Sequence, residues 1–377
     1  MRLSTLFLSL LPLVSAAPGK PKAPKYFSNR EIFTPPSNAN WTDPKVLYAR
    51  AAQLDDNTFL ATWENYSPEP PSVYFPIFRS TDGGYTWSEF SRVEDQVNGW
   101  GLRYQPFLHV LAKPLGGFPA GTVLLAGSSI PTDLSLTQID LYASTDAGKS
   151  WAFVSHIASG GEARPTNGLT PVWEPFLLEY SGKLICFYSD QRDPRYGQKM
   201  VHQTTTDLKS WGPVVDDVRY PTYTDRPGMP TVQQLPNGKY IMAYEYGGGP
   251  TDTDAYEFPV HYKISSSPET FDAAEGQRLV ATDGTIPKGS PYVVWSKEGG
   301  KNGTLIASAH SSGDVYVNKG LGEGEWVAVK TPQPNAYTRY LGVGKDQKKL
   351  MIMGAGQLPP SEDNQVSVSV VDVKKLS

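Results

Sequence analysis

The sequence contains a single cysteine, Cys186, among 377 residues, so no disulfide can form within the chain. Cys186 stands in the apolar run 184–187, which predicts a buried, inert thiol rather than a nucleophile. Only five histidines are present, and they are scattered without the spacing of metal ligands. The sequence therefore predicts no metal site and no cofactor.

Long runs of basic residues are also absent, and the net charge is −4, so nucleic acid is not an expected partner. No apolar stretch is long enough to span a bilayer, which argues against a membrane partner. The apolar run 3–14 follows Met1 and Arg2 and precedes small residues, as in a secretory signal peptide. We expect a signal peptide over residues 1–17, a secreted, extracellular and monomeric product, and one catalytic domain over residues 18–377. Sequons at Asn40, Asn65 and Asn302 fit a secreted glycoprotein.

The chain is instead rich in turn-forming residues, with 35 glycines and 33 prolines, and 12% of its residues are aromatic. A hairpin pattern, S-x-D-x-G-x-[ST]-W, occurs at residues 80–87 and returns at 144–151. A shorter copy lies at 205–211 and a faint one at 267–271. The aspartate side chain can accept bonds from the following amides, and the glycine supplies a positive φ. The pattern resembles the Asp-box of sialidase-like β-propellers, which marks the turn between the third and fourth strands of a blade.

A second repeat places a proline before an apolar strand, at Pro106, Pro175, Pro230 and Pro291, at intervals of about 55 to 70 residues. We expect each proline at the first residue of its strand, where no ladder hydrogen bond is lost. The sequence thus predicts an all-β, six-bladed propeller with four antiparallel strands per blade. The lone strand 30–33 should complete the last blade and close the ring. Five blades is the alternative count.

In a propeller, the residues before each first strand and after each second strand converge on one axial mouth. Glu174 and Glu245 are the two carboxylates that this rule brings there among aromatic residues, whereas Glu64 and Asp190 fit solvated rim charges better. Paired carboxylates with aromatic walls suit glycoside hydrolysis, because one must hold a proton and the other must stay ionised. Residues expected to bind substrate there are Tyr104, Gln105, Trp173, Asp190, Tyr246, Ser290, Tyr337 and Arg339.

The W-E-P-F motif at Glu174, the A-Y-E-Y-G-G-G motif at Glu245 and the segment 335–340 resemble the fungal exo-1,5-α-L-arabinanases of glycoside hydrolase family 93. The resemblance implies a secreted retaining enzyme that releases arabinobiose from the non-reducing end of linear arabinan, its polysaccharide partner. It also implies catalytic roles for Glu174 and Glu245 and an assisting tyrosine in the last blade, which is Tyr340 by register or alternatively Tyr337. By analogy with sialidases, we hypothesise that Glu245 is the nucleophile and Glu174 the acid/base, with the reverse assignment open.

Two alternatives are a sialidase and a non-catalytic carbohydrate-binding propeller. A sialidase needs three arginines around the substrate carboxylate, and Arg50, Arg103, Arg226 and Arg339 are candidates. The segment around Arg30, however, lacks the F/Y-R-x-P pattern of sialidases. A binding propeller would keep the aromatic mouth and lose the carboxylate pair, which is present here.

Overall fold

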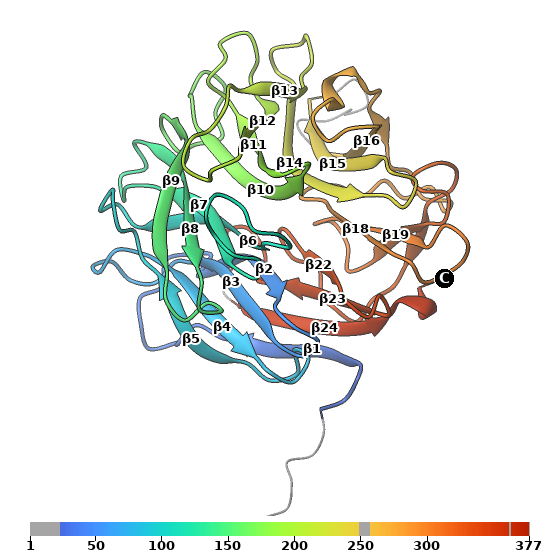
Figure 1. Cartoon of the computed structure of the whole chain (residues 1–377), viewed down its shortest axis with the longest axis horizontal. Coiled ribbons are helices and arrows are strands. Elements are labelled where there is room, and N and C mark those ends of the chain that lie inside the picture. Colours follow the sequence, from blue (N-terminus) through green and yellow to red (C-terminus); the bar gives the residue numbers. More distant parts are fainter. Residues whose placement is uncertain (1–22, 249–256, 362, 377) are drawn as a thin grey trace, which may run out of the picture.

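The computed structural model describes residues 23–248, 257–361 and 363–376. Six antiparallel sheets of four strands each surround a central axis (Figure 1). The prediction of an all-β, six-bladed propeller is confirmed, and the five-bladed alternative is wrong. Within the described ranges the only helices are the short 3-10 turns η1 (Phe271–Ala273) and η2 (Val373–Lys375), and no helix there could cross a membrane. The predicted signal peptide, residues 1–17, lies outside these ranges.

The strands of each blade follow one another along the chain, from the innermost to the outermost. Blade 1 contains β2 (Val46–Gln53), β3 (Phe59–Asn65), β4 (Phe75–Ser80) and β5 (Ser88–Val93), and blade 2 contains β6 (Leu102–Val110), β7 (Val123–Ser129), β8 (Thr137–Ser144) and β9 (Ala152–Gly160). Blade 3 contains β10 (Val172–Tyr180), β11 (Lys183–Asp190), β12 (Lys199–Thr205) and β13 (Val215–Val218), and blade 4 contains β14 (Arg226–Gln234), β15 (Tyr240–Gly247), β16 (Val260–Ser265) and β17 (Gln277–Arg278). Blade 5 contains β18 (Tyr292–Ser296), β19 (Thr304–Ser308), β20 (Val315–Asn318) and β21 (Val327–Val329).

Blade 6 joins the two ends of the chain. It contains β22 (Tyr340–Val343), β23 (Lys349–Gly354), β24 (Val366–Asp372) and, outermost, β1 (Phe27–Phe33). Figure 1 shows β1, in blue, beside β24, in red. The predicted ring closure by the first strand is confirmed.

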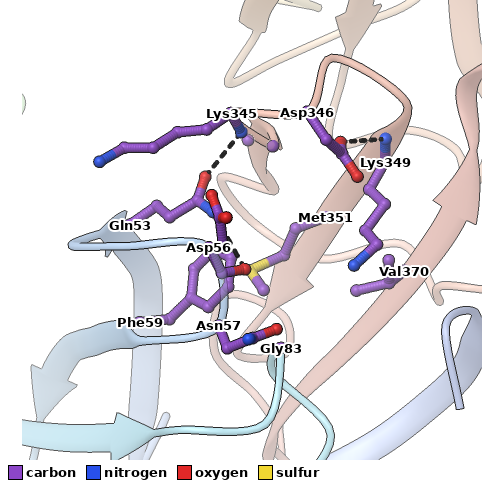
Figure 2. A pocket seen from close by; sticks show the side chains of 12 residues that line it. Gln53, Asp56, Asn57, Phe59, Gly83, Lys345, Asp346, Lys349, Met351 and Val370 are labelled. Carbon is purple, nitrogen blue, oxygen red and sulfur yellow. Dashed lines mark hydrogen bonds between the residues drawn. The ribbon is translucent and has the colours of Figure 1, made fainter.

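The seam between blades 6 and 1 encloses a cavity of about 420 Å³ (Figure 2). Hydrogen bonds cross the seam from the β22–β23 turn: Lys345 N donates to Gln53 Oε1 at 2.9 Å, and Lys345 Nζ donates to the Leu54 carbonyl at 2.8 Å. The ring is therefore held by side-chain contacts of blade 1 with blade 6 in addition to the β1–β24 ladder.

The two full Asp-box repeats form the predicted turns. Asp82 Oδ1 accepts the amides of Tyr85 and Thr86, and its Oδ2 accepts the Thr86 hydroxyl at 2.6 Å. The Ser80 hydroxyl donates to Asp82 Oδ1 and accepts the Gly84 amide. The side chains of Ser80, Asp82 and Thr86 thus bond to one another or to amides inside the turn.

The same bonds recur around Asp146, and the shorter third copy keeps the amide bonds to Asp207. These turns also connect neighbouring blades. The Trp151 indole donates to Ser91 on β5, and the Trp211 indole donates to Ser155 on β9. The motif therefore contributes to blade packing as well as to the hairpin, and no catalytic role is indicated for it.

The prolines of the second repeat do not begin their strands, so that prediction is wrong for three of the four. Pro106, Pro175 and Pro230 lie inside β6, β10 and β14, each at a shift in strand register, and Pro291 directly precedes β18. A bulge leaves one residue out of the ladder, so a proline there loses no strand-pairing bond. Each blade has one left-handed residue near this point, in the inner strand or just before it: Tyr48, Gln105, Glu174, Met229, Ser290 and Thr338.

Candidate active site

A cavity of about 1070 Å³ opens at one end of the propeller axis. Its walls come from the first residues of the inner strands, the last residues of the second strands and the loops that join the blades. Five carboxylate residues line it: Asp43 and Glu257 come from connecting loops, and Glu64, Glu174 and Glu245 come from the strands of the blades. Other lining residues that matter below are Tyr66, Tyr104, Gln105, Trp173, Gln198, Arg226, Ser290, His310 and Tyr337.

The strands place these glutamates by simple rules. Glu64 and Glu245 lie near the ends of β3 and β15, which are the second strands of blades 1 and 4. Glu174 lies on β10 at the bulge, with a left-handed φ of 64°. Such a backbone conformation is unfavourable for a side chain with a Cβ and is common at functional sites.

Glu174 has two donors on a single carboxylate oxygen. Ser189 Oγ donates to its Oε2 at 2.6 Å, and the Met229 amide donates to the same oxygen at 2.8 Å. Burial raises the pKa of Glu174, and these two bonds oppose that rise, with further help from the charges of Arg226 and Arg50. These bonds and charges limit the rise, so the pKa of Glu174 lies above its ordinary range but below the position that burial alone would give it.

Glu245 accepts one bond, from the Ser290 amide to Oε2 at 2.7 Å. Burial, and after it the charge of the nearby Glu174 carboxylate, raise the pKa of Glu245 to about 8. Glu245 pairs across the ladder with Gly228, and a Cβ on Gly228 would lie 3.6 Å from Glu174 Oε2. Both glutamates therefore lie beside Gly228. The raised pKa of Glu245 keeps it protonated near neutral pH.

Glu64 is the third carboxyl group that the strands contribute and is almost fully buried. It accepts the Tyr66 hydroxyl at 2.7 Å and the Gln105 amide at 2.9 Å. Burial raises its pKa to about 7 against the effect of these bonds. The interpretation of Glu64 as a solvated rim charge is therefore wrong, because its side chain is buried in the cavity wall and both oxygens accept protein hydrogen bonds.

Two tyrosines were candidates for the assisting residue, and only one reaches the cavity. Tyr337 lines it, and the charges of Glu245, Glu174 and Glu64 add to burial in raising the pKa of its hydroxyl. Tyr340 does not line it and packs edge-to-face on Tyr292, with ring centroids 5.3 Å apart. The β22 strand begins at Tyr340, so its side chain lies among the core residues of the axis.

Four other predicted substrate-binding residues line the cavity, namely Tyr104, Gln105, Trp173 and Ser290. Three do not. Arg339 is fully buried and donates to the carbonyls of Ser312 and Asp314. Asp190 forms an ion pair with Arg192 at 2.7 Å. The Tyr246 hydroxyl donates to Asp225 at 2.8 Å. Each is consumed by contacts inside its own blade or with an adjacent loop, which sequence position alone does not reveal.

Two cationic residues, Lys288 and Arg226, line the cavity. The sequence suggested Arg226 only as part of a sialidase site. Arg226 donates to Asn167 Oδ1 at 2.5 Å and to Gln191 and Gln198. Arg103 instead pairs with Glu69 at 2.9 Å, and neither it, Arg50 nor Arg339 is among the cavity-lining residues. An arginine triad for a carboxylate-bearing sugar is therefore not formed in the described cavity.

The described residues contain no cluster of His, Cys, Asp or Glu side chains suited to hold a metal ion. Cys186 is fully buried, and burial raises the pKa of its thiol. This agrees with the predicted inert thiol.

Two solved structures resemble the chain closely. An α-L-arabinanase from Penicillium chrysogenum, complexed with arabinobiose, is 58% identical, and the match covers 94% of this chain and 100% of that one with a TM-score of 0.91. The glycoside hydrolase family 93 α-L-arabinofuranosidase of Fusarium graminearum, also with arabinobiose, is 55% identical over 94% and 99% of the chains, with a TM-score of 0.92.

A more distant match shares the fold alone. The NanB sialidase of Streptococcus pneumoniae is 10% identical over 93% of this chain and 71% of that one, with a TM-score of 0.58. No protein-family model and no curated protein sequence matches this chain.

Proposed function

The chain belongs to glycoside hydrolase family 93, and on that premise we propose that it is a retaining exo-arabinanase that releases arabinobiose from the non-reducing end of linear 1,5-α-L-arabinan. The observation that carries the proposal is the pair Glu174 and Glu245, two carboxyl groups with different donors in one aromatic-walled cavity. Both relatives named above hold arabinobiose, which supports the substrate class.

The hydrogen bonds support a division of roles opposite to the one hypothesised from sialidases. Glu174, with two donors on one oxygen, is the better nucleophile, and Glu245, with a pKa of about 8, is the better acid. In the first step a Glu174 oxygen bonds to the anomeric carbon, while Glu245 gives its proton to the leaving glycosidic oxygen. In the second step Glu245 takes a proton from water, whose oxygen displaces Glu174 from the anomeric carbon.

Tyr337 has the position of the assisting residue in this scheme. Its hydroxyl donates to Met229 Sδ at 3.8 Å, and burial together with the charges of Glu245, Glu174 and Glu64 keeps it protonated. A neutral phenol can donate a hydrogen bond to a carboxylate without adding charge to the cavity. We therefore assign the assisting role to Tyr337 in place of Tyr340.

The test is product analysis followed by chemical rescue. Purified enzyme with linear arabinan should release arabinobiose alone in the first minutes, whereas a ladder of oligomers would refute the exo mode. Azide added to Glu174→Ala should give the inverted glycosyl azide, and azide added to Glu245→Ala should give the retained one. The opposite pattern would restore the original assignment of roles.

Secretion is part of the same proposal and predicts which sequons carry glycans. Asn40 and Asn302 are exposed, but Asn65 is 4% exposed and its amide donates to Ser67 Oγ. We expect mass spectrometry of the secreted protein to find an N-terminus near Pro18 and glycans at Asn40 and Asn302. A glycan at Asn65 would contradict the buried position of that side chain.

A further inference from the structure

The axial mouth contains one left-handed residue in each blade, with φ between 46° and 64°. Six residues with a Cβ in this conformation require support from their surroundings, because each is disfavoured on its own. The supporting contacts come from the neighbouring blade and involve the glutamates of the cavity.

Four of these backbones are held by a side chain of the preceding blade. The Gln105 amide donates to Glu64 at 2.9 Å, and the Glu174 amide donates to Gln105 Oε1 at 3.2 Å. The Met229 amide donates to Glu174 at 2.8 Å, and the Ser290 amide donates to Glu245 at 2.7 Å. A continuous series of bonds thus runs from Glu64 through Gln105 and Glu174 to Met229.

Gln105 differs from the other acceptors in this series because its side chain is neutral. Its Oε1 also accepts the Ser128 hydroxyl at 3.4 Å, and the residue is only 9% exposed. Its amide oxygen is therefore fixed toward the Glu174 backbone. A carboxylate at the same place would hold the Glu174 amide equally well and would repel the Glu174 carboxylate.

We propose that Gln105 is the positioning residue of Glu174: it holds the Glu174 backbone in its left-handed conformation without adding a charge beside the reacting carboxylate. Glu64 supports Glu174 indirectly, because it accepts the Gln105 amide and so fixes the Gln105 backbone. The inference rests on the proposed role of Glu174 in glycoside hydrolysis, and it predicts that blade 2, which supplies neither of the two reacting carboxylates, controls the angle of attack.

The first test replaces the acceptor and compares it with a matched control. Gln105→Met keeps the size of the side chain and removes the bond, so kcat should fall at least about 10-fold while KM changes less than about threefold. The control, Gln138→Met, removes another buried side-chain amide of blade 2, which donates to the Ala158 carbonyl at 3.0 Å and does not line the cavity. It should leave kcat within about threefold of the wild type. A raised KM with unchanged kcat, or equal losses in both variants, would overturn the proposal.

The second test adds a charge and includes one measurement that does not depend on turnover. Gln105→Glu keeps an acceptor for the Glu174 amide, so kcat at its optimum should recover relative to Gln105→Met, and the acidic limb of the pH profile should move to higher pH. Carbon-13 NMR titration of labelled glutamate side chains should show the same upward shift for Glu174. An unchanged Glu174 titration would refute the inference even if arabinan is cut, whereas a shifted titration in a protein that leaves arabinan intact would refute only the proposed function.

Discussion

Glu64, Glu174 and Glu245 share one cavity, yet their donors differ, and this difference makes the site usable for acid and base chemistry at one pH. Two hydrogen bonds favour the ionised form of Glu174, while Glu245 has one and a neighbouring anion. Groups of like charge at close range cannot all ionise, so the least supported carboxyl group keeps its proton.

The pH profile of kcat/KM should therefore be bell-shaped. Glu245 must be protonated to act as the acid, so activity should fall as pH rises through about 8. Glu174 must be ionised to attack, so activity should also fall at low pH, on a limb that lies above the ordinary glutamate range because burial raises its pKa. Initial rates on linear arabinan over a wide pH range give both limbs, and a profile that still rises beyond about pH 9 would contradict the role of Glu245.

Replacing Arg226 should move both limbs of the pH profile of kcat/KM in a known direction. Its charge lowers the pKa of Glu174 and of Glu245, so Arg226→Met should shift both limbs to higher pH, by roughly half a unit to one unit. Arg103→Met is the matched control, since Arg103 pairs with Glu69 away from the lining residues. A shift in the control of the same size would mean that the effect is not local to the cavity.

The two candidate tyrosines can be separated by removing a single oxygen from each. Tyr337→Phe should lower kcat by roughly 10- to 100-fold, because it removes a hydroxyl whose pKa the charges of the three glutamates raise. Tyr340→Phe should change kcat less than about threefold, because its ring packs on Tyr292 below the cavity. Steady-state kinetics of both variants, with thermal unfolding as the check on folding, decide between them, and a larger loss for Tyr340→Phe would refute the assignment of Tyr337.

Strand register in the sequence places Glu174 and Glu245 at the mouth of the propeller, and both line the cavity. It predicts a solvated rim charge for Glu64, which is buried and lines the same cavity. The same register also suggested Arg339 and Asp190, whose side chains are taken up by Asp314 and Arg192. Strand position determines where a Cα lies, whereas the choice between substrate and a neighbouring side chain depends on contacts between segments distant in sequence.

At the scale of a single turn, the Asp-box copies differ at one informative position. Gly83 and Ala147 occupy the same place in the first two copies, and both have a positive φ, 80° and 61°. The next position is glycine in both copies, because a Cβ on Gly84 or Gly148 would clash with Met351 or Leu60. The first position has no such neighbour, so its preference for glycine comes from the backbone alone.

Exchanging the two residues should therefore change stability in opposite directions. Ala147→Gly should raise the free energy of unfolding and Gly83→Ala should lower it, each by about 1 kcal/mol, because only glycine adopts a left-handed conformation without a steric cost. Urea denaturation of both variants measures the changes. Two effects of the same sign would show that contacts, and not φ, decide stability at this position.

The third copy explains why the motif weakens along the chain without losing its turn. Leu208 has a φ of 62° where glycine would be easier, yet its side chain is fully buried in the core. The burial of a leucine offsets the backbone cost. The proline repeat is harder to interpret from sequence, because the pattern of apolar residues does not show a β-bulge. The predicted starts of β6, β10 and β14 therefore lie several residues after the observed ones.

On the scale of the whole molecule, the repeats made the fold predictable. Asp-boxes and prolines recur at blade intervals, and each blade needs neighbours to cover its faces, so a ring with a completing strand follows from the sequence. The cavity follows less directly, because its lining includes Asp43, Phe258 and Leu358 from connecting loops that belong to no repeat.

The aromatic contact between β1 of blade 6 and blade 1, which closes the ring, should be a main determinant of global stability. Phe33 of β1 packs against Trp63 and Phe78 of blade 1, with ring centroids 5.5 and 5.7 Å apart, so it joins the first and last blades. Phe33→Ala should lower the free energy of unfolding by about 2 to 4 kcal/mol, since a cavity would form between the blades. Val97→Ala, at a side chain that is 46% exposed, should change it by less than about 0.5 kcal/mol. Because the cavity is lined by residues from blades all around the ring, arabinanase activity and near-ultraviolet circular dichroism of Phe33→Ala should be lost together on heating. Retention of activity after the spectral change would show that the cavity does not depend on ring closure.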